Sequence, residues 1–156
     1  IEQSDIDKHI NEVTGFITKK TSPYTTEQLE EAMQTVMDSY AGGIKTNYRF
    51  NEKQLDIADY KIKQLMSLIS TLYAEDFQEL MYIYELKERL TVCRSVIAHL
   101  KARKETRWHS FAENLDYPNK DEKNFNKYVN SRLENGEIKI IIRDLVQGGK
   151  EYEHIN

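Results

Sequence analysis

Cysteine is almost absent from this sequence, which has one in 156 residues, and long apolar runs are missing altogether. A single cysteine, Cys93, excludes a disulfide framework and a thiolate metal cage. No apolar run approaches the roughly 20 residues that cross a bilayer, and no signal-peptide pattern opens the chain. A cytoplasmic location is therefore the default expectation.

Basic residues are too few for a nucleic-acid surface. The formal net charge is −4, whereas non-specific binding to phosphate backbones needs a net basic face. With 39% apolar and 31% charged residues, the composition predicts one globular domain with a sizeable core and a polar surface. The chain begins at Ile1 rather than Met, which suggests an excised fragment or a processed terminus.

Catalytic and cofactor motifs are missing as well. The sequence has no glycine-rich loop between a strand and a helix, and so no phosphate or dinucleotide cradle. Cys93 falls inside an apolar helical stripe, where a buried inert thiol is expected. We therefore expect no catalytic residue, cofactor site or metal site in the chain itself. The four histidines lie far apart, without metal-ligand spacing: His9, His99, His109 and His154.

The first predicted helix is short and amphipathic. Ser4 is expected to cap it. Residues 21–24, Thr-Ser-Pro-Tyr, indicate a break after it. Its apolar face is expected to hold Ile6, Ile10, Val13 and Ile17.

The second and third predicted helices each begin with a capping box. Thr25 pairs with Gln28 in one and Asn51 with Gln54 in the other. Gly42-Gly43 ends the second helix, because glycine readily adopts the left-handed conformation of helix C-termini. The inward positions are Leu29, Ala32, Met33, Val36, Met37 and Tyr40 in the second helix, and Leu55, Ala58, Ile62, Leu65, Ile69 and Leu72 in the third.

The fourth predicted helix, from about residue 76 to about 104, has the strongest apolar periodicity. At 1.5 Å per residue it is a rod on the order of 40 Å long, which must bury its stripe against comparable helices. An antiparallel bundle does this most simply, with residues 73–75 as the tight connection from the third helix. We expect Phe77, Met81 and Tyr84 to widen the core. The stripe itself is Leu80, Ile83, Leu86, Leu90, Cys93, Ile97 and Leu100.

A β-hairpin is predicted near the C-terminus. Residues 128–133 and 137–142 flank Glu134-Asn135-Gly136, and Asn-Gly between such runs is a strong hairpin signal. The predicted fold class is thus mainly α: an antiparallel three-helix bundle with an additional N-terminal helix and a small C-terminal hairpin. The expected division is an N-terminal helix and linker at 1–24, the bundle with its hairpin at 25–146, and a polar tail at 147–156.

The end of the fourth helix carries a dense set of arginines, a carboxylate and the only tryptophan. Guanidinium groups bind carboxylates in a planar fork and tolerate partial burial, so these residues suit a docking surface. The helix dipole alone explains cations at a helix end, but Arg107 and Trp108 should lie beyond that end. We expect an exposed patch in which Arg107→Ala costs little stability, roughly 0–1 kcal/mol. The docking candidates are Arg103, Glu105, Arg107, Trp108, Asp116, Tyr117 and Arg132.

Several motifs in this region resemble one flavoprotein family. The runs ARKETRW, LDYP, KDEKNF and KYVNSR follow one another as in the C-terminal helical domain of the succinate dehydrogenase/fumarate reductase flavoprotein family. The resemblance is closer to the adenylylsulfate reductase alpha-subunit branch. It covers roughly residues 26–143, because two upstream runs match as well, QTVMDSYAGGI and LMYIYELKERLTVCRSVIAHLKARKETR. Thr106-Arg107-Trp108 stands where the dehydrogenases usually carry Ser-Arg-Gly and a His. Succinate or fumarate is therefore not assumed as the substrate.

The resemblance implies a fold and a set of partners. In the family a three-helix, spectrin-repeat-like bundle packs against the FAD-binding domain, and both FAD and substrate sit in domains that these 156 residues do not contain. No catalytic Arg or His of the family maps onto this chain. The implied partners are the FAD-binding domain of the same chain and an iron–sulfur subunit. The resemblance implies FAD in the parent protein but none in this fragment, and it is compatible with a parent at the inner face of the membrane.

Three functions stay open from the sequence. The first is the C-terminal domain of an FAD-dependent oxidoreductase, serving assembly rather than bond-making. The second is a free-standing helical module whose Arg/Trp patch binds a partner protein. The third is a winged-helix-like nucleic-acid binder with a reader helix at 121–131 and a wing at 137–142, against which the acidic charge argues.

Overall fold

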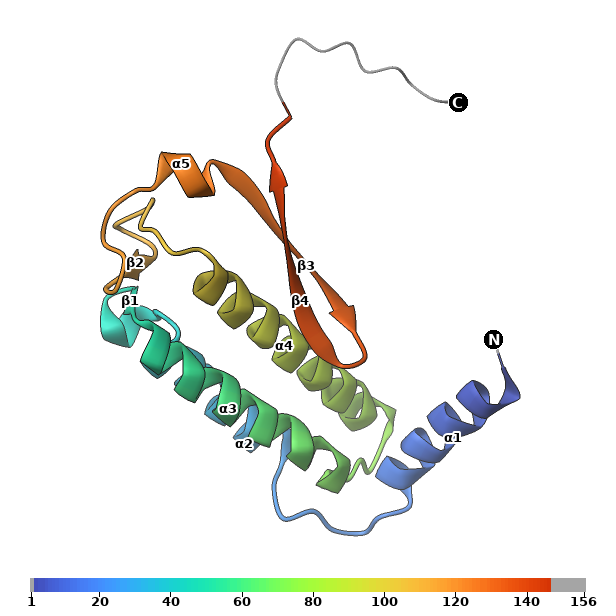
Figure 1. The fold of residues 1–156 in the computed structure, drawn as a ribbon. Coiled ribbons are helices and arrows are strands. Elements are labelled where there is room, and N and C mark those ends of the chain that lie inside the picture. The colour runs from blue at the N-terminus through green and yellow to red at the C-terminus, as the bar shows by residue number, and fades with distance from the viewer. Residues whose placement is uncertain (1, 147–156) are drawn as a thin grey trace.

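The computed structural model describes residues 2–146, and it contains a helical bundle with a β-hairpin lying beside it (Figure 1). This confirms the predicted fold class. The helices are α1 (Gln3–Ile17), α2 (Thr26–Tyr40), α3 (Glu52–Leu68), α4 (Phe77–Ala102) and α5 (Glu122–Phe125), with single 3₁₀ turns η1 (Ile44–Thr46) and η2 (Ile69–Thr71). The strands are β1 (Arg49–Phe50), β2 (Glu113–Asn114), β3 (Lys127–Glu134) and β4 (Glu137–Asp144).

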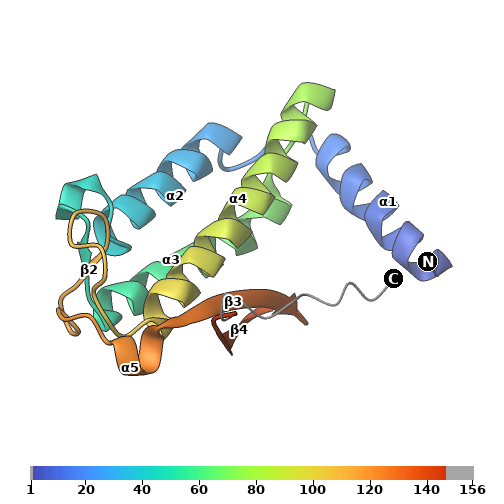
Figure 2. The same ribbon diagram turned by 90° about the horizontal axis from the view of Figure 1, so that it is seen from above.

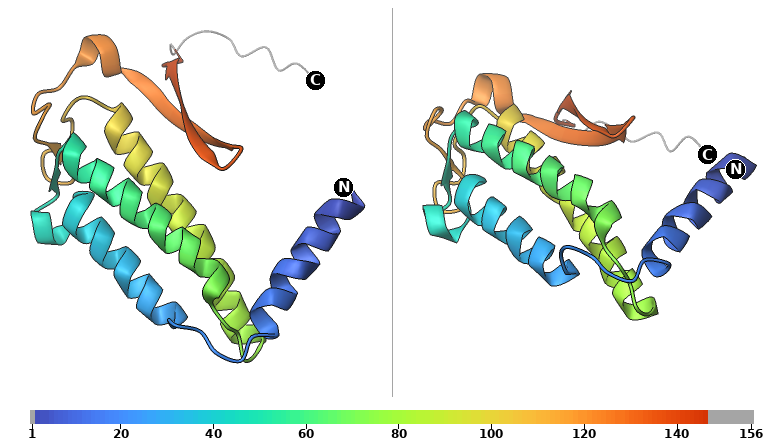
Figure 3. Two further views of the ribbon diagram at one scale, coloured as in Figure 1. Left: turned by 60° about the horizontal axis from the view of Figure 1, so that its bottom comes forward. Right: turned by 90° about the horizontal axis from the view of Figure 1, so that it is seen from below.

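Helices α2, α3 and α4 lie side by side, each antiparallel to the one before it (Figures 1 and 3). Both predicted capping boxes are present, because the side chains of Thr25 and Asn51 each accept a hydrogen bond from the backbone N–H three residues on. Gly42, with φ of 76°, follows the end of α2 as predicted. Local sequence signals therefore set the helix starts that align the bundle.

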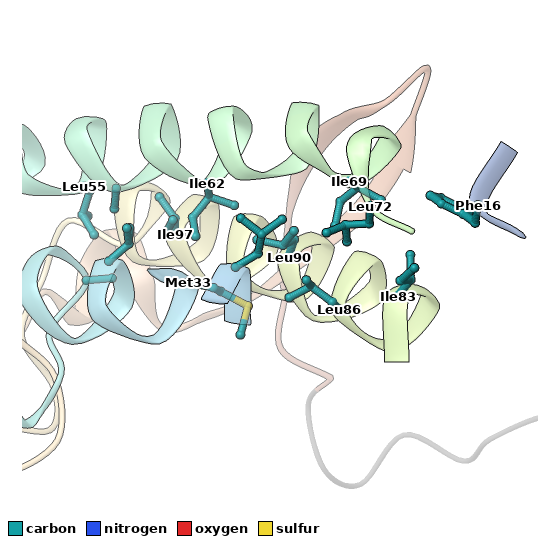
Figure 4. Packing of buried hydrophobic residues seen from close by; sticks show 14 of the residues in the cluster. Phe16, Met33, Leu55, Ile62, Ile69, Leu72, Ile83, Leu86, Leu90 and Ile97 are labelled. Carbon is teal, nitrogen blue, oxygen red and sulfur yellow. The ribbon is translucent and has the colours of Figure 1, made fainter. Parts of the chain in front are cut away.

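The core runs along the interface of the three helices (Figure 4). Leu55, Ile62 and Leu90 are completely buried at its centre. Burying an aliphatic side chain of this size contributes about 1.5–3 kcal/mol, so this interface is the main source of stability. The other fully buried apolar side chains from α3, α4 and the connection between them are Ala58, Leu72, Ile83, Leu86 and Ile97.

Two of the side chains predicted to widen the core do not reach it. Phe77 is 85% exposed and Met81 is 52% exposed, so the prediction was wrong for both. A helix turns by about 100° per residue, and Met81 therefore faces nearly opposite to Ile83, which points into the core. Tyr84 does pack against the core, with its ring edge-on to Phe16.

Helix α1 departs from the prediction at its start and in its buried face. It begins at Gln3 with Glu2 at the N-cap position, so Ser4 lies inside the helix and is not the cap. Its one buried side chain is Phe16, which the predicted stripe did not include. The third helix also ends earlier than predicted: Ile69 begins η2 and Leu72 follows it, although both side chains are buried.

The hairpin forms around Asn135-Gly136 as predicted. Both residues have positive φ, which is the backbone of a tight two-residue turn, and β3 pairs antiparallel with β4 along eight residues. The reader helix predicted at 121–131 is wrong. Asp121 caps only the single turn α5, and the chain then enters β3 because its backbone pairs with β4.

A two-residue parallel pair, β1 with β2, joins the turn after α2 to the segment after α4. Figure 2 shows these strands at one end of the bundle, beside the start of α3 and the end of α4. The proposed division into 1–24 and 25–146 stays a prediction. The predicted polar tail at 147–156 lies outside the described residues, as does His154.

Candidate functional site

The chain leaves α4 at Arg103 and folds over that end of the bundle before it enters β3; we call residues 103–126 the cap (Figure 1). Its fold depends on two buried polar side chains, Thr106 and Asn114. The Thr106 hydroxyl accepts the Asn114 N–H at 2.9 Å and donates to the Tyr117 carbonyl at 2.9 Å. Because these bonds are buried, they fix the path of the cap backbone.

A buried carboxylate holds the cap together. The side chain of Glu105 is completely buried. One oxygen, Oε1, accepts from Arg103 Nη1 at 2.5 Å and Arg107 Nε at 2.9 Å, and Oε2 accepts from Arg107 Nη2 at 3.0 Å and the Asp121 N–H at 2.8 Å. Four donors therefore satisfy one buried acid, which is the condition for burying a charge.

Protonation of this group follows from the same contacts. Burial acts to raise the pKa of Glu105, but the hydrogen bonds from Arg107, the Asp121 backbone and Arg103 outweigh it and bring the pKa below the ordinary glutamate value. The hydrogen bond to Glu105 raises the pKa of Arg107 in turn. Glu105 and Arg107 are thus both charged at neutral pH.

Both arginines hold α5 within the cap, and Arg103 also ties the cap to the hairpin. Arg103 donates to the carbonyls of Phe125 and Lys127 at 3.0 and 3.1 Å, and Arg107 donates to Phe125 at 3.3 Å. Most of their donors are therefore used inside the domain. The expectation of an exposed ion pair at Arg107 is wrong, because its partner carboxylate is fully buried.

Large apolar side chains project from this fixed frame. Trp108 is 67% exposed, Phe111 72% and Leu115 50%, and Tyr48 is also exposed next to β1. The two chain segments meet because the Glu113 N–H donates to the Tyr48 carbonyl and the Leu115 N–H to the Phe50 carbonyl. We call Tyr48, Trp108, Phe111 and Leu115 the cap patch. Exposed apolar side chains on a rigid support are typical of an interaction site.

Backbone strain accompanies the patch. Asn47 and Tyr48 are consecutive non-glycine residues with φ of 52° and 62°, a conformation that is rare for a tyrosine. Strand β1 begins directly after Tyr48 and pairs with β2, and this pairing holds Tyr48 in that conformation. Such strain persists only where surrounding structure fixes it, and it tends to occur at functional positions.

The structure brings together only part of the predicted docking set. Arg103, Glu105 and Arg107 form the buried cluster, with Trp108 next to them on the surface. Asp116 accepts the Glu52 N–H at 2.7 Å and so helps to cap α3, while Tyr117 lies under the Lys104 ammonium, 5.5 Å from ring centroid to Nζ. Arg132 is apart from the cluster, on the hairpin, where it pairs with Glu134.

Sequence reasoning missed Phe111, Leu115 and Tyr48 because they belong to irregular segments. Apolar residues there carry no periodicity, and only the long-range pairing of β1 with β2 makes them neighbours. It also missed Arg94, which is 7% exposed on α4. The sequence does indicate that Arg94 is buried, because it lies four residues after Leu90 and three before Ile97, which is the spacing of the buried stripe.

Arg94 binds the hairpin turn. It donates to the Gly136 carbonyl at 2.8 Å and to the Glu137 carboxylate at 2.7 Å, and its Nε lies 3.8 Å from Asp59. Nearby, the Ser95 and Ser131 hydroxyls are 3.1 Å apart. The hairpin is therefore held on α4 by polar contacts as well as by its half-buried isoleucines, Ile138 and Ile140.

The described residues offer little for chemistry. Within 2–146 no group of three or more His, Cys, Asp or Glu is placed to hold a metal ion. Burial raises the pKa of the Cys93 thiol, which makes it a poor nucleophile at neutral pH. Over the same residues, no helix has the length and apolar character needed to cross a membrane.

Comparison with known proteins places this arrangement in a family. The model of the fumarate reductase flavoprotein C-terminal domain matches residues 30–151, most of the chain. The chain belongs to this family. The match begins within α2, so it takes in the bundle, the cap and the hairpin, and it leaves α1 outside.

Within the fumarate reductase flavoprotein C-terminal family, the similarity lies toward the adenylylsulfate reductase branch. The alpha subunit of adenylylsulfate reductase from Megalodesulfovibrio gigas is 29% identical over 97 residues, which are 62% of this chain and 15% of that protein. The structure of adenylylsulfate reductase from the hyperthermophilic Archaeoglobus fulgidus superposes with a TM-score of 0.86 at 26% identity, over 94% of this chain and 25% of that one.

The fumarate reductases share the fold at lower identity. Quinol fumarate reductase from E. coli matches with a TM-score of 0.74 and 17% identity over 92% of this chain and 24% of that one. The chain thus spans about a quarter or less of the length of these relatives. The family assignment describes a domain, and the relatives carry most of their length elsewhere.

Proposed function

We propose that this domain serves the assembly of an FAD-dependent oxidoreductase subunit, and that the cap patch docks on the FAD-binding domain of the same chain. The observation that carries the proposal is the cap itself. A buried charge cluster holds the segment rigid while Trp108 and Phe111 stand exposed on it. Rigid aromatic side chains bind with little loss of conformational entropy, and they dominate many interfaces.

The chemistry of the cluster favours docking over catalysis. Four donors occupy the Glu105 carboxylate. Most of the N–H donors of the two arginines bind this carboxylate or backbone carbonyls. Glu122, a cap carboxylate that contacts Arg107 at 3.6 Å, is 54% exposed and is itself paired with Lys120. We therefore assign a positioning role to Arg103, Glu105 and Arg107, and the contact surface is the cap patch.

The described residues do not fit FAD. A dinucleotide fold needs parallel strands linked by a helix with a glycine-rich turn, and the parallel pair found here has two residues per strand. We therefore place FAD in another part of the parent chain. By resemblance to the family, an iron–sulfur subunit is the proposed redox partner of that parent. A cytoplasmic location stays a prediction.

Substitution of the cap patch in the full-length chain tests the docking role. Trp108→Ala with Phe111→Ala should leave the melting temperature of the 156-residue chain nearly unchanged, because both side chains are mostly exposed. In the full-length protein the same pair should weaken the contact between the two domains, seen as faster proteolysis between them and faster loss of FAD on dilution.

Phe77→Ala is the control, since Phe77 is an aromatic that is more exposed still and lies at the opposite end of α4. It should change neither proteolysis nor FAD loss. If the cap variant behaves like this control in the full-length protein, the cap patch is not the docking surface. A native gene that encodes only this length would instead favour the free-standing interaction module.

A further inference from the structure

Helix α1 carries an apolar stripe in which three isoleucines are exposed and Val13 is half-buried. Ile6, Ile10, Val13 and Ile17 recur at spacings of four, three and four, which places them on one side of the helix. Ile6 is 42% exposed, Ile10 56% and Ile17 48%. We call these four residues the α1 stripe.

The attachment of α1 to the bundle is confined to its C-terminal end. Phe16 packs into the core and its carbonyl accepts the Ala74 N–H at 3.1 Å. Just before and after it, Glu12 pairs with Lys87 and Lys19 donates to the Ser70 carbonyl. From there α1 extends away from the bundle toward its N-terminus (Figures 1 and 3).

Such a helix needs a further contact to be stable. A 15-residue helix is marginal in water on its own, and α1 has no side-chain hydrogen bond at its N-cap. Packing of an apolar face supplies most of the stability of helices in proteins. The exposed half of α1 therefore calls for a surface that covers Ile6 and Ile10.

We propose that the α1 stripe docks on the FAD-binding domain of the same chain, as a second attachment point beside the cap patch. The identity of this partner rests on the function proposed above. The stripe is small: three isoleucines, each about half exposed, present far less than the roughly 800 Å² per partner of a stable interface between separate proteins. A covalent tether makes so small a contact effective, because it raises the local concentration of the partner to about the millimolar range.

The structural comparison supports this partner. The superposition on Archaeoglobus fulgidus adenylylsulfate reductase leaves out about 6% of the 156 residues, which is fewer than the 15 residues of α1. Part of α1 therefore recurs in a chain about four times as long. The family model, by contrast, starts only at residue 30. Helix α1 thus lies outside the family match but partly inside the superposed region.

Hydrogen exchange at residues 3–11 tests the proposal. In the full-length protein these amides should exchange at least tenfold more slowly than in the 156-residue chain. The substitutions Ile6→Gln with Ile10→Gln, which keep good helix formers, should return the full-length protein to the faster exchange. Lys8→Gln is the control, because Lys8 lies about 200° around the helix from both Ile6 and Ile10, and it should keep the slow exchange.

Equal exchange in the full-length protein and the 156-residue chain would overturn the proposal. Slow exchange in the 156-residue chain that depends on its concentration would also overturn it, because a second copy would then cover the stripe. The cap variant Trp108→Ala with Phe111→Ala separates the two claims. If this variant changes neither proteolysis between the domains nor FAD loss, while residues 3–11 stay protected in the full-length protein, then the cap docking fails and the α1 contact stands.

Discussion

Glu105 and Arg107 form a two-point ion pair in which the carboxylate side chain is fully buried and the arginine side chain is 21% exposed. The Nε–Oε1 and Nη2–Oε2 distances are 2.9 and 3.0 Å. A planar fork of this kind fixes orientation as well as distance. It links the start of the cap to α5, and so fixes the backbone from which Trp108 projects.

Replacement of the buried carboxylate should destabilise the isolated chain. Glu105→Gln keeps the shape but leaves two arginines facing a neutral amide, so we expect a loss of about 2–4 kcal/mol in the free energy of unfolding, measured by urea denaturation. Glu122→Gln is the control, since Glu122 is half exposed and contacts the same Arg107 at 3.6 Å. Equal losses in the two variants would contradict the internal role of Glu105.

Acid should weaken the domain through the same residue. Because the pKa of Glu105 is lower in the folded chain than in the unfolded chain, the unfolded chain binds more protons, and stability falls as pH falls. The contribution is fully present above the unfolded value of about 4.3 and is lost as pH drops through the folded value. Urea denaturation between neutral pH and acid should show a shallower decline for Glu105→Gln than for the wild type.

Loss of the buried arginine on α4 should loosen the hairpin. Arg94→Ala removes the bonds to Gly136 and Glu137, and we expect faster hydrogen exchange in β3 and β4 with a stability loss of about 1–3 kcal/mol. Arg89→Ala, on the same helix, should cost at most about 1 kcal/mol because its ion pairs are exposed. Unchanged hairpin exchange in Arg94→Ala would show that apolar packing alone holds the hairpin.

Two glycines should respond to alanine in opposite directions. A Cβ at Gly43 would overlap the backbone and carboxylate of Asp38, which packs against the turn after α2. Gly43→Ala should therefore lower the melting temperature. Nothing lies within 4 Å of a Cβ at Gly15, which is helical, so Gly15→Ala should stabilise α1 by about 0.5–1 kcal/mol. A stabilising Gly43→Ala would mean that this turn is not as tightly packed as described.

The elements that sequence predicted well are those specified by neighbouring residues. The capping boxes at Thr25 and Asn51 and the Asn135-Gly136 turn depend on contacts within three or four positions. The elements that it missed depend on distant contacts. Burial of Glu105 needs Asp121 and Phe125 to fold back over it, and the cap patch needs β1 to pair with β2. From charge and spacing, residues 103–108 were predicted to form one exposed surface. In the structure Glu105 is buried between Arg103 and Arg107, and Trp108 is the aromatic side chain that projects from the segment.

Photo-crosslinking from position 108 tests the central claim most directly. Trp108 would be replaced by p-benzoylphenylalanine in the full-length protein, irradiated, and the crosslinked peptides identified by mass spectrometry. The docking account predicts crosslinks to the FAD-binding domain of the same chain, and none from the same probe at Phe77. Crosslinks from position 108 that stay within these 156 residues, or that match those from position 77, would contradict it.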